Sequence, residues 1–445
     1  MNFLPNTDKD REEMLKTIGV HSIDELFSDV PPNMRYKGSL NIPPALSEYE
    51  LSNHMRELAE KNKASGMVSF IGAGTYDHYI PSVVRHVLSR SEFYTAYTPY
   101  QAEISQAVLQ SIYEYQSMIC ELTGMDAANA SMYDGASAAA ESVTIAAGLT
   151  RRKRALVSKT VHPETREVIR TYAAGHDILI EEVSYEQGVT SLDDLRGRLD
   201  KDVCCVVLQQ PNFFGNLESV NELSAMVKEH GATLVVSANP MSLGLLAPPA
   251  EYGADIVVGD GQVFGNPMAF GGPHLGIMAV NQKYLRRMPG RLVGMTSDDQ
   301  GRRGFVLTLQ TREQHIRREK ATSNICSNQA LNALAATVYL SWLGKEGIRE
   351  VGEQCVQKAH YLADRISAIK GFGVAWDAPF FHEFAVKCPL EANQIVDALS
   401  EKGILAGCPL GRFYPELKDY LLIAVTEKRT KDEMDDLVAG LEELA

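Results

Sequence analysis

Residues 93–106 gather aromatic rings and hydrogen-bonding groups in one short irregular stretch ahead of an expected helix. The side chains that could contact a ligand are Tyr94, Tyr97, Tyr100, Gln101 and Glu103. Functional residues concentrate on loops that a rigid fold positions, so this stretch is a candidate lining of a substrate pocket. An aromatic plug whose hydroxyl groups bond to the backbone would have the same composition. The sequence leaves both interpretations open.

A second polar stretch covers residues 310–320 and reads QTREQHIRREK. Arg312 and His315 are its candidates for contact with a ligand. The alternative is a solvated helical face on which Glu313 pairs with Arg317 one turn later.

Residues 254–276 have the pattern of a buried strand, a glycine-rich turn and a second strand. In enzymes of the large pyridoxal phosphate (PLP) fold, such a segment carries the lysine that holds the cofactor as a Schiff base. Here that position is Gln262, and no lysine occurs between Lys228 and Lys283. An amide nitrogen is not nucleophilic and cannot form an imine. The sequence therefore predicts a body of this kind that cannot bind PLP covalently.

PLP chemistry also needs a phosphate-binding turn at a helix start, where free backbone N–H groups meet the anion. The candidates for such a turn, as a vestigial cradle, are Gly135, Ala136 and Ser137. The preceding Asp134 would repel a phosphate. The acid that faces the pyridine nitrogen is expected at Val236, and a valine cannot stabilise a protonated ring. Asp260 is an alternative acid or a simple turn residue.

Composition indicates a large globular protein. Its 445 residues are 45% hydrophobic and 22% charged, which is enough for two or three domains. We expect a cytoplasmic protein, because the N-terminus lacks a signal peptide and no apolar run is long enough to span a membrane. The seven cysteines include no C-x-x-C pair, so neither disulfides nor a metal site are expected. A net charge of −14 argues against nucleic-acid binding.

Three regions follow from the pattern along the chain. Residues 1–66 are predicted as an N-terminal helical arm, broken by prolines, that wraps over this subunit or a partner. Residues 67–330 alternate short β-branched runs with helix-length segments, which predicts a mainly parallel α/β sheet with helices on both faces. Residues 331–445 are predicted as a smaller C-terminal α+β domain. The predicted strands are MVSFIG, RALVSK, DILIEEV, VCCVVLQQ, TLVVSA, DIVVGD and LGIMAV, followed by EFAVKC, GILAG and YLLIAVT.

Five long motifs resemble the glycine decarboxylase P-protein of the glycine cleavage system. They are FIGAGTYDHYIP, EFYTAYTPYQAEISQ, MICELTGMDAANASMYDGAS, QVFGNPMAFGGPHLG and LQTREQHIRREKATSNIC. The chain is more narrowly similar to the N-terminal half of this family, which some bacteria encode separately as subunit 1. The family's other half has a His-Lys pair before its glycine-rich run, and that lysine falls on Gln262 when the two are laid together.

The resemblance implies a PLP-dependent transferase fold of type I and a division of labour between two chains. A PLP-bearing subunit 2 would decarboxylate glycine and pass the aminomethyl group to the lipoyl arm of H-protein. This chain would complete and stabilise that active site, first through the residues named in 93–106 and second through Arg312 and His315. The family also suggests a heterotetramer with two chains of each kind.

Two alternatives remain open at this point. One is a self-sufficient PLP enzyme that uses another lysine, such as Lys159 or Lys283. The other is a non-catalytic scaffold that only stabilises or regulates a partner.

Overall fold

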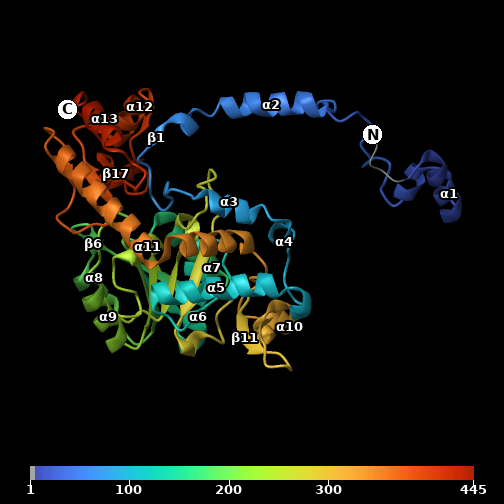
Figure 1. Cartoon of the computed structure of the whole chain (residues 1–445), viewed down its shortest axis with the longest axis horizontal. Helices are drawn as coiled ribbons and strands as arrows, with labels where there is room; N and C mark the ends of the chain where they lie inside the picture. Colours follow the sequence, from blue (N-terminus) through green and yellow to red (C-terminus); the bar gives the residue numbers. More distant parts are fainter. Residues whose placement is uncertain (1–5) are drawn as a thin grey trace. The chain divides into compact units, whose positions relative to one another are not determined.

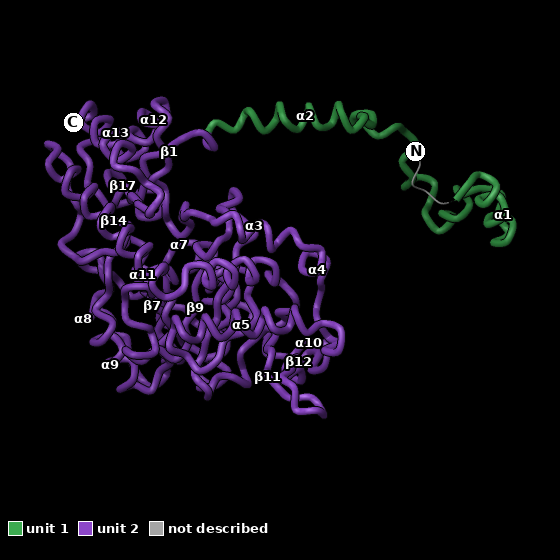
Figure 2. The backbone as a smooth tube through the Cα atoms, viewed as in Figure 1, with its two compact units in different colours: residues 1–63 green, residues 64–445 purple. Residues whose placement is uncertain are grey.

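The computed structural model describes residues 6–445 and divides the chain into two units, residues 1–63 and 64–445 (Figure 2). The first unit contains the helices α1 (Asp8–Ile18) and α2 (Glu48–Glu60) and the short 3₁₀ helix η1 (Ile23–Phe27). Capping boxes begin both α-helices, with Thr7 bonded to Asp10 and Ser47 bonded to Glu50. None of the described residues in this unit is buried.

A seven-stranded sheet forms the centre of the second unit, with the strand order β2-β10-β9-β8-β7-β3-β4. Figure 1 shows the strands of this unit with helices around them. Strands β9, β8, β7, β3 and β4 are parallel, whereas β10 runs antiparallel to both β9 and β2. Their bounds are β2 Ala127–Ala128, β3 Arg154–Ser158, β4 Leu179–Val183, β7 Val203–Gln210, β8 Thr233–Ala238, β9 Ile256–Asp260 and β10 Gly276–Val280. The predicted, mainly parallel sheet is therefore confirmed.

Helices cover both faces of this sheet because successive strand residues point to opposite sides. On one face Val157, Val207 and Val258 pack with α6 (Gly135–Thr150) and α7 (Pro163–Ala174). On the other face Leu208, Val236 and Val257 pack with α5 (Gln106–Thr123), α8 (Leu192–Arg198), α9 (Val220–Glu229) and α11 (Ala330–Ser367). The near-continuous apolar runs that predicted these strands reflect this burial on two sides.

The C-terminal part of the chain forms a smaller four-stranded sheet, with the order β13-β14-β17-β16. These strands span Gly373–Val374, Glu383–Lys387, Tyr420–Ala424 and Cys408–Pro409. A separate core packs them against α12 (Ala392–Ser400), α13 (Lys431–Glu442) and the second half of α11. Helix α11 is interrupted at Gly344, where φ is 60° and ψ is −176°. The predicted boundary between residues 330 and 331 stays a prediction.

One predicted strand is misplaced. The run MVSFIG forms β1 (Val68–Ser69), which pairs in parallel with β15 (Ile404–Leu405) and not with the seven-stranded sheet. The place at that sheet's edge belongs to β2, which pairs with β10. A period-two pattern marks a strand but carries no information about which strand, here 336 residues later, completes the pair.

The remaining elements are short. They are α3 Ser82–Leu88, α4 Ser91–Tyr94, α10 Gln314–Arg317, β5 Tyr185–Glu186, β6 Val189–Thr190, β11 Val293–Ser297 and β12 Arg303–Leu307. The last two pair as a hairpin beside α5. Among the described residues, no helix is both long enough and apolar enough to cross a bilayer.

Candidate functional site

A cavity of about 710 Å³ lies at the carboxyl edge of the central sheet. Its floor consists of residues that end three neighbouring parallel strands: Gln209, Ser237, Ala238, Asn239 and Asp260. The start of α6 and residues 73–76 form two of its walls. Open α/β sheets bind their ligands at this edge, so the cavity is the candidate functional site.

The helix start in this cavity is already occupied by carboxylates of the chain itself. Asp134 is the N-cap of α6, and its Oδ1 accepts a hydrogen bond of 2.7 Å from the Ser137 amide. The Gly135 amide donates to Asp260 Oδ2 at 3.1 Å. A phosphate needs free N–H groups and positive potential at a helix start. Here two negative side chains accept hydrogen bonds from the Gly135 and Ser137 amides. The predicted cradle at Gly135, Ala136 and Ser137 does line the cavity, but these carboxylates would repel a phosphate.

Gln262 is 2% exposed and does not line the cavity. Its Oε1 accepts from the Tyr76 amide at 3.0 Å, and its Nε2 donates to the Tyr76 carbonyl at 3.0 Å. A third bond joins Nε2 to the Asn266 carbonyl at 2.8 Å. The side chain at the expected lysine position therefore pins the backbone of the cavity wall, and its amide has no hydrogen-bonding capacity left for a ligand oxygen.

Asp260, the alternative acid, is fixed by hydrogen bonds at both oxygens. Oδ1 accepts from the Gln262 amide at 2.9 Å, and Oδ2, besides the bond from Gly135, lies 3.5 Å from His274 Nδ1. The Asp260 carboxylate raises the pKa of His274 above its usual range, against the opposing effect of burial. Val236 is fully buried in the core and does not face the cavity. Asp260 therefore belongs to the closed polar network around the helix start.

Residues 73–76 are held from the opposite side by Glu383 on β14. Its two carboxylate oxygens accept from the Ala73 amide at 2.6 Å and from the Tyr76 hydroxyl at 2.8 Å. Burial raises the pKa of Glu383 to about 7, although both hydrogen bonds oppose the shift. The cavity wall is thus clamped between the large sheet, through Gln262, and the small sheet, through Glu383.

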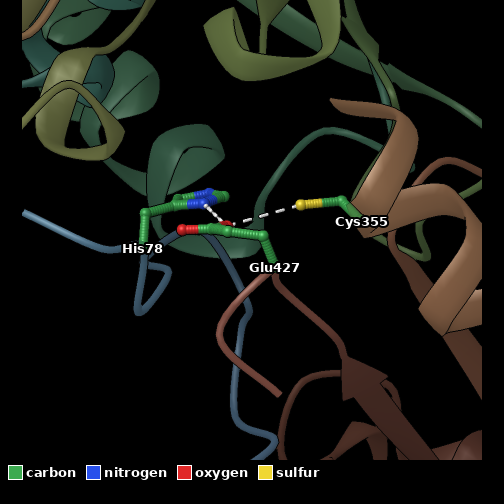
Figure 3. Close-up of side chains that lie close together, drawn as sticks. All are labelled: His78, Cys355 and Glu427. Atoms are coloured by element: carbon green, nitrogen blue, oxygen red, sulfur yellow. Dashed lines mark hydrogen bonds and ion pairs between the residues drawn. The ribbon is translucent and has the colours of Figure 1, made fainter. Parts of the chain in front are cut away.

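The next residues of this segment are fastened by Glu427, which follows β17 (Figure 3). His78 Nδ1 lies 2.6 Å from Glu427 Oε2, the Tyr79 amide donates to Oε1 at 2.6 Å, and Cys355 Sγ donates to Oε2 at 3.6 Å. A histidine, a cysteine and a glutamate are common metal ligands, and their polar atoms lie within 4.8 Å of one another. Here they bond to each other and tie the segment to α11.

The seven residues predicted to contact a ligand lie outside this cavity. Tyr94, Tyr97, Gln101 and Glu103 are exposed, with Tyr97 at 81%. Tyr100 is also half exposed, but its hydroxyl accepts a bond of 2.7 Å from Arg291 Nη2. These five residues therefore face outward and do not line this chain's own site.

Arg291 joins the two predicted stretches. Beside its bond to Tyr100, it forms a buried ion pair with Glu313, and its Nη2 lies 3.6 Å from Cys326 Sγ. His315 Nε2 contacts the same sulfur at 3.2 Å. Arg312 donates only to backbone carbonyls, those of Met288, Leu309 and Gly290. His315 and Tyr100 are thus linked through Cys326 and Arg291. Arg312 holds the backbone at residues 288–290 and 309 and does not point to a ligand site.

A family model described as glycine cleavage system P-protein matches residues 1–441. The chain belongs to the glycine cleavage system P-protein family. A curated relative from Anoxybacillus flavithermus, called a probable glycine dehydrogenase (decarboxylating) subunit 1, is 54% identical over 99% of this chain and 98% of its own length. The name subunit 1 implies a partner subunit.

Solved structures agree with this membership. A glycine decarboxylase (P-protein) of the glycine cleavage system, in inhibitor-bound form, is 42% identical with a TM-score of 0.92 and covers 100% of both chains. A Lactobacillus brevis glutamate decarboxylase is 14% identical, covers 92% of this chain and 94% of its own, and has a TM-score of 0.67, which shows the fold alone. The predicted PLP-dependent transferase fold of type I is confirmed.

PLP belongs to the fold family of the P-proteins, but the residues in this chain's cavity do not fit the cofactor. None of the described residues that line the cavity is a lysine, and carboxylates accept the Gly135 and Ser137 amides at the helix start, where a phosphate would bind. Lys283 forms a 2.6 Å ion pair with Asp255, which precedes β9 and so lies about 17 Å from the cavity end of that strand. Lys159 follows β3 but does not line the cavity.

Sequence reasoning missed two residues that organise this P-protein chain. Arg291 stands in the stretch PGRLV, where nothing in the local pattern separates it from a surface arginine. Glu383 begins a short apolar strand and likewise gives no local signal. A charged residue within an otherwise apolar run is a hint of a buried partner, since unpaired charges are rarely buried.

Proposed function

We propose that this chain is the subunit without PLP in a two-subunit glycine decarboxylase, the aminomethyl-transferring glycine dehydrogenase of the glycine cleavage system. The complex releases CO2 from glycine and passes the aminomethyl group to the lipoyl arm of H-protein. PLP, when bound, supplies the electron sink for the decarboxylation, and we assign its covalent attachment to the partner, subunit 2. The assignment carries with it a cytoplasmic location and a heterotetramer of two chains of each kind.

One observation supports this division of labour above all others. The amide of Gln262 replaces the lysine, and it is used completely in holding Tyr76 and Asn266. A residue that only marked a lost lysine would need no such set of bonds. These bonds make residues 73–76 a rigid wall of the cavity. A rigid wall suits a subunit that shapes and supports a neighbouring site.

The contribution of this chain to that neighbouring site comes from residues 93–106. Tyr94, Tyr97, Gln101 and Glu103 are exposed and free to meet a second chain, while Arg291 holds Tyr100 by a hydrogen bond and a cation–π contact of 5.2 Å to the ring centroid. Active sites of this fold lie near subunit interfaces. His315 reaches the same region and is the second choice, whereas Arg312 acts through the backbone that it binds.

The attachment of PLP can be tested by mass. Each purified subunit, and the two together, are incubated with PLP and reduced with borohydride, and the intact mass of each chain is then measured by mass spectrometry. Reduction converts an imine into a stable amine. We expect one PLP on subunit 2 and none on this chain. A stoichiometric adduct on one lysine of this chain would refute the proposal in favour of a self-sufficient enzyme.

The contribution of the aromatic stretch is tested in the assembled enzyme. Tyr97→Phe and Gln101→Ala should each lower glycine decarboxylation by about tenfold, the effect of one lost hydrogen bond of ~1.4 kcal/mol in the transition state. Gln282→Ala, an exposed glutamine at the opposite edge of the sheet, is the control. Unchanged turnover in both variants would remove this stretch from the site. Turnover by subunit 2 without this chain would favour a pure scaffold.

A further inference from the structure

The cavity at the carboxyl edge of the central sheet does not fit PLP, but it is large enough for another ligand. Its volume of about 710 Å³ lies within the range of about 300–1,000 Å³ that is typical of small-molecule sites. Such sites combine apolar walls with a few polar groups that select the ligand. The polar groups of this cavity therefore indicate which chemical class it accepts.

Negative charge dominates the lining of the cavity. Its acidic and basic side chains are Asp134, Glu164, Asp260, His162 and His274, and none of the described lining residues is a lysine or an arginine. Burial lowers the pKa of His162, so this imidazole is neutral at neutral pH. His274 lies 3.5 Å from Asp260 and, when protonated, offsets only that carboxylate. Within the described part of the chain, Asp134 and Glu164 are thus left without a positive partner.

Asp134 has one carboxylate oxygen available to a ligand. Its Oδ1 accepts the capping bond of 2.7 Å from the Ser137 amide, whereas Oδ2 forms no hydrogen bond to any described residue. Tyr133 and Tyr172 line the cavity beside it. Burial, and then the nearby charges of Glu141 and Asp134, raise the pKa of Tyr172. A carboxylate beside aromatic rings is an arrangement that binds an ammonium group.

The floor of the cavity offers two amide donors. Gln209 Oε1 accepts a bond of 2.8 Å from the His162 amide, and Asn239 Oδ1 accepts one of 3.1 Å from the Met241 amide. These bonds fix the oxygen end of each side chain, so the NH2 groups are the ends left over. Neither NH2 group donates to another described residue. They suit an oxygen acceptor, and a neutral one avoids repulsion from the two uncompensated carboxylates.

We propose that this cavity binds a small organic amine that also carries a neutral oxygen acceptor, such as an amide or a hydroxyl group. The ammonium group bonds to Asp134 Oδ2 beside Tyr172, and the oxygen accepts from Gln209 or Asn239. A free amino acid or a phosphorylated cofactor brings an anionic group into a negative lining and is disfavoured. An inorganic cation has the right charge but leaves most of a cavity of this size unfilled.

Two matched probes test the chemical class. γ-Aminobutyramide and γ-aminobutyrate share the ammonium group and the chain length, and they differ only in the amide or carboxylate at the other end. Binding of each to the full-length chain is measured by isothermal titration calorimetry at neutral pH. We expect saturable binding of the amide, with a dissociation constant at least about tenfold lower than that of the acid, because the acid's carboxylate is repelled.

Substitutions test the position of the ammonium group. Asp134→Asn removes the charge but keeps the cap of α6, because asparagine and aspartate are equally good N-caps. It should keep a melting temperature near the wild-type value and weaken binding of γ-aminobutyramide about tenfold, the effect of one lost bond to a charged group. Glu164→Gln tests the second carboxylate. Asp299→Asn, in the exposed turn between β11 and β12, is the charge-matched control and should change binding less than twofold.

Three results would overturn the inference: no saturable binding of γ-aminobutyramide, equal affinities for the two probes, or unchanged binding in both Asp134→Asn and Glu164→Gln. Direct binding of potassium ions that is lost in Asp134→Asn would assign the cavity to an inorganic cation instead. These measurements involve this chain alone, so a failure of the proposed division of labour with subunit 2 would leave them unchanged.

Discussion

Replacement of Gln262 by methionine would measure what the residue at the predicted lysine position does. Methionine has a similar length and volume but no hydrogen-bonding amide. The change leaves three buried backbone groups without partners: the Tyr76 N–H, the Tyr76 carbonyl and the Asn266 carbonyl. If Gln262 is only the remnant of a catalytic position, this substitution should cost little. If it supports the cavity wall, the cost should be large.

The magnitude follows from these bonds. A buried donor or acceptor that loses its partner costs about 1–3 kcal/mol, and an N–H group is the least tolerant of the loss. The Tyr76 amide alone therefore accounts for ~2 kcal/mol, and the two carbonyls raise the total to roughly 3–5 kcal/mol. The side chain is 2% exposed, so water does not replace the lost bonds without a local opening.

Hydrogen exchange of residues 73–79 and urea unfolding of the isolated chain are the two assays. A local loss of ~3 kcal/mol speeds exchange of the Tyr76 amide about 150-fold, since each 1.4 kcal/mol is tenfold. Gln282→Met is the control, because Gln282 is exposed and donates no side-chain bond in the described structure. A change below ~0.5 kcal/mol in Gln262→Met, equal to that of the control, would refute the supporting role.

Two other predictions concern buried charges. The pKa of Glu383, raised to about 7 by burial, gives a contribution to stability that is full below pH 4.5 and lost as the pH rises through 7. In urea unfolding, the free energy of unfolding of Glu383→Gln relative to the wild type should therefore rise by roughly 3 kcal/mol between pH 4.5 and 8.5. A difference that stays constant over this pH range would contradict the prediction. Arg291→Lys keeps the charge but not the fork that holds Tyr100 and Glu313, so exchange in residues 97–103 should rise at least about tenfold, whereas the exposed Arg302→Lys should leave it unchanged.

The sequence was sufficient for the central sheet because its strands are buried on both faces. Runs such as VCCVVLQQ are nearly all apolar, and the stretches between them have helical length. It was insufficient for β1, whose two residues pair with a strand near the other end of the chain. Local pattern defines an element, whereas pairing over such a distance depends on the packing of the whole fold.

For the site, chemistry at single positions was predictable and contacts were not. That Gln262 cannot form an imine and that Asp134 opposes a phosphate follow from the residue types. The bonds from Gln262 to Tyr76, and the joint capping of α6 by Asp134 and Asp260, need the tertiary structure. The same holds for Arg291, whose partners Tyr100 and Glu313 lie 191 and 22 residues away along the chain.

The capped start of α6 has a consequence for the supply of cofactor to the complex. An open helix start with free N–H groups binds phosphate, so such a position competes for a phosphorylated cofactor such as PLP. Asp134 and Asp260 close that position in this chain. On the proposed division of labour, an excess of this chain over its partner would therefore leave PLP available to the partner.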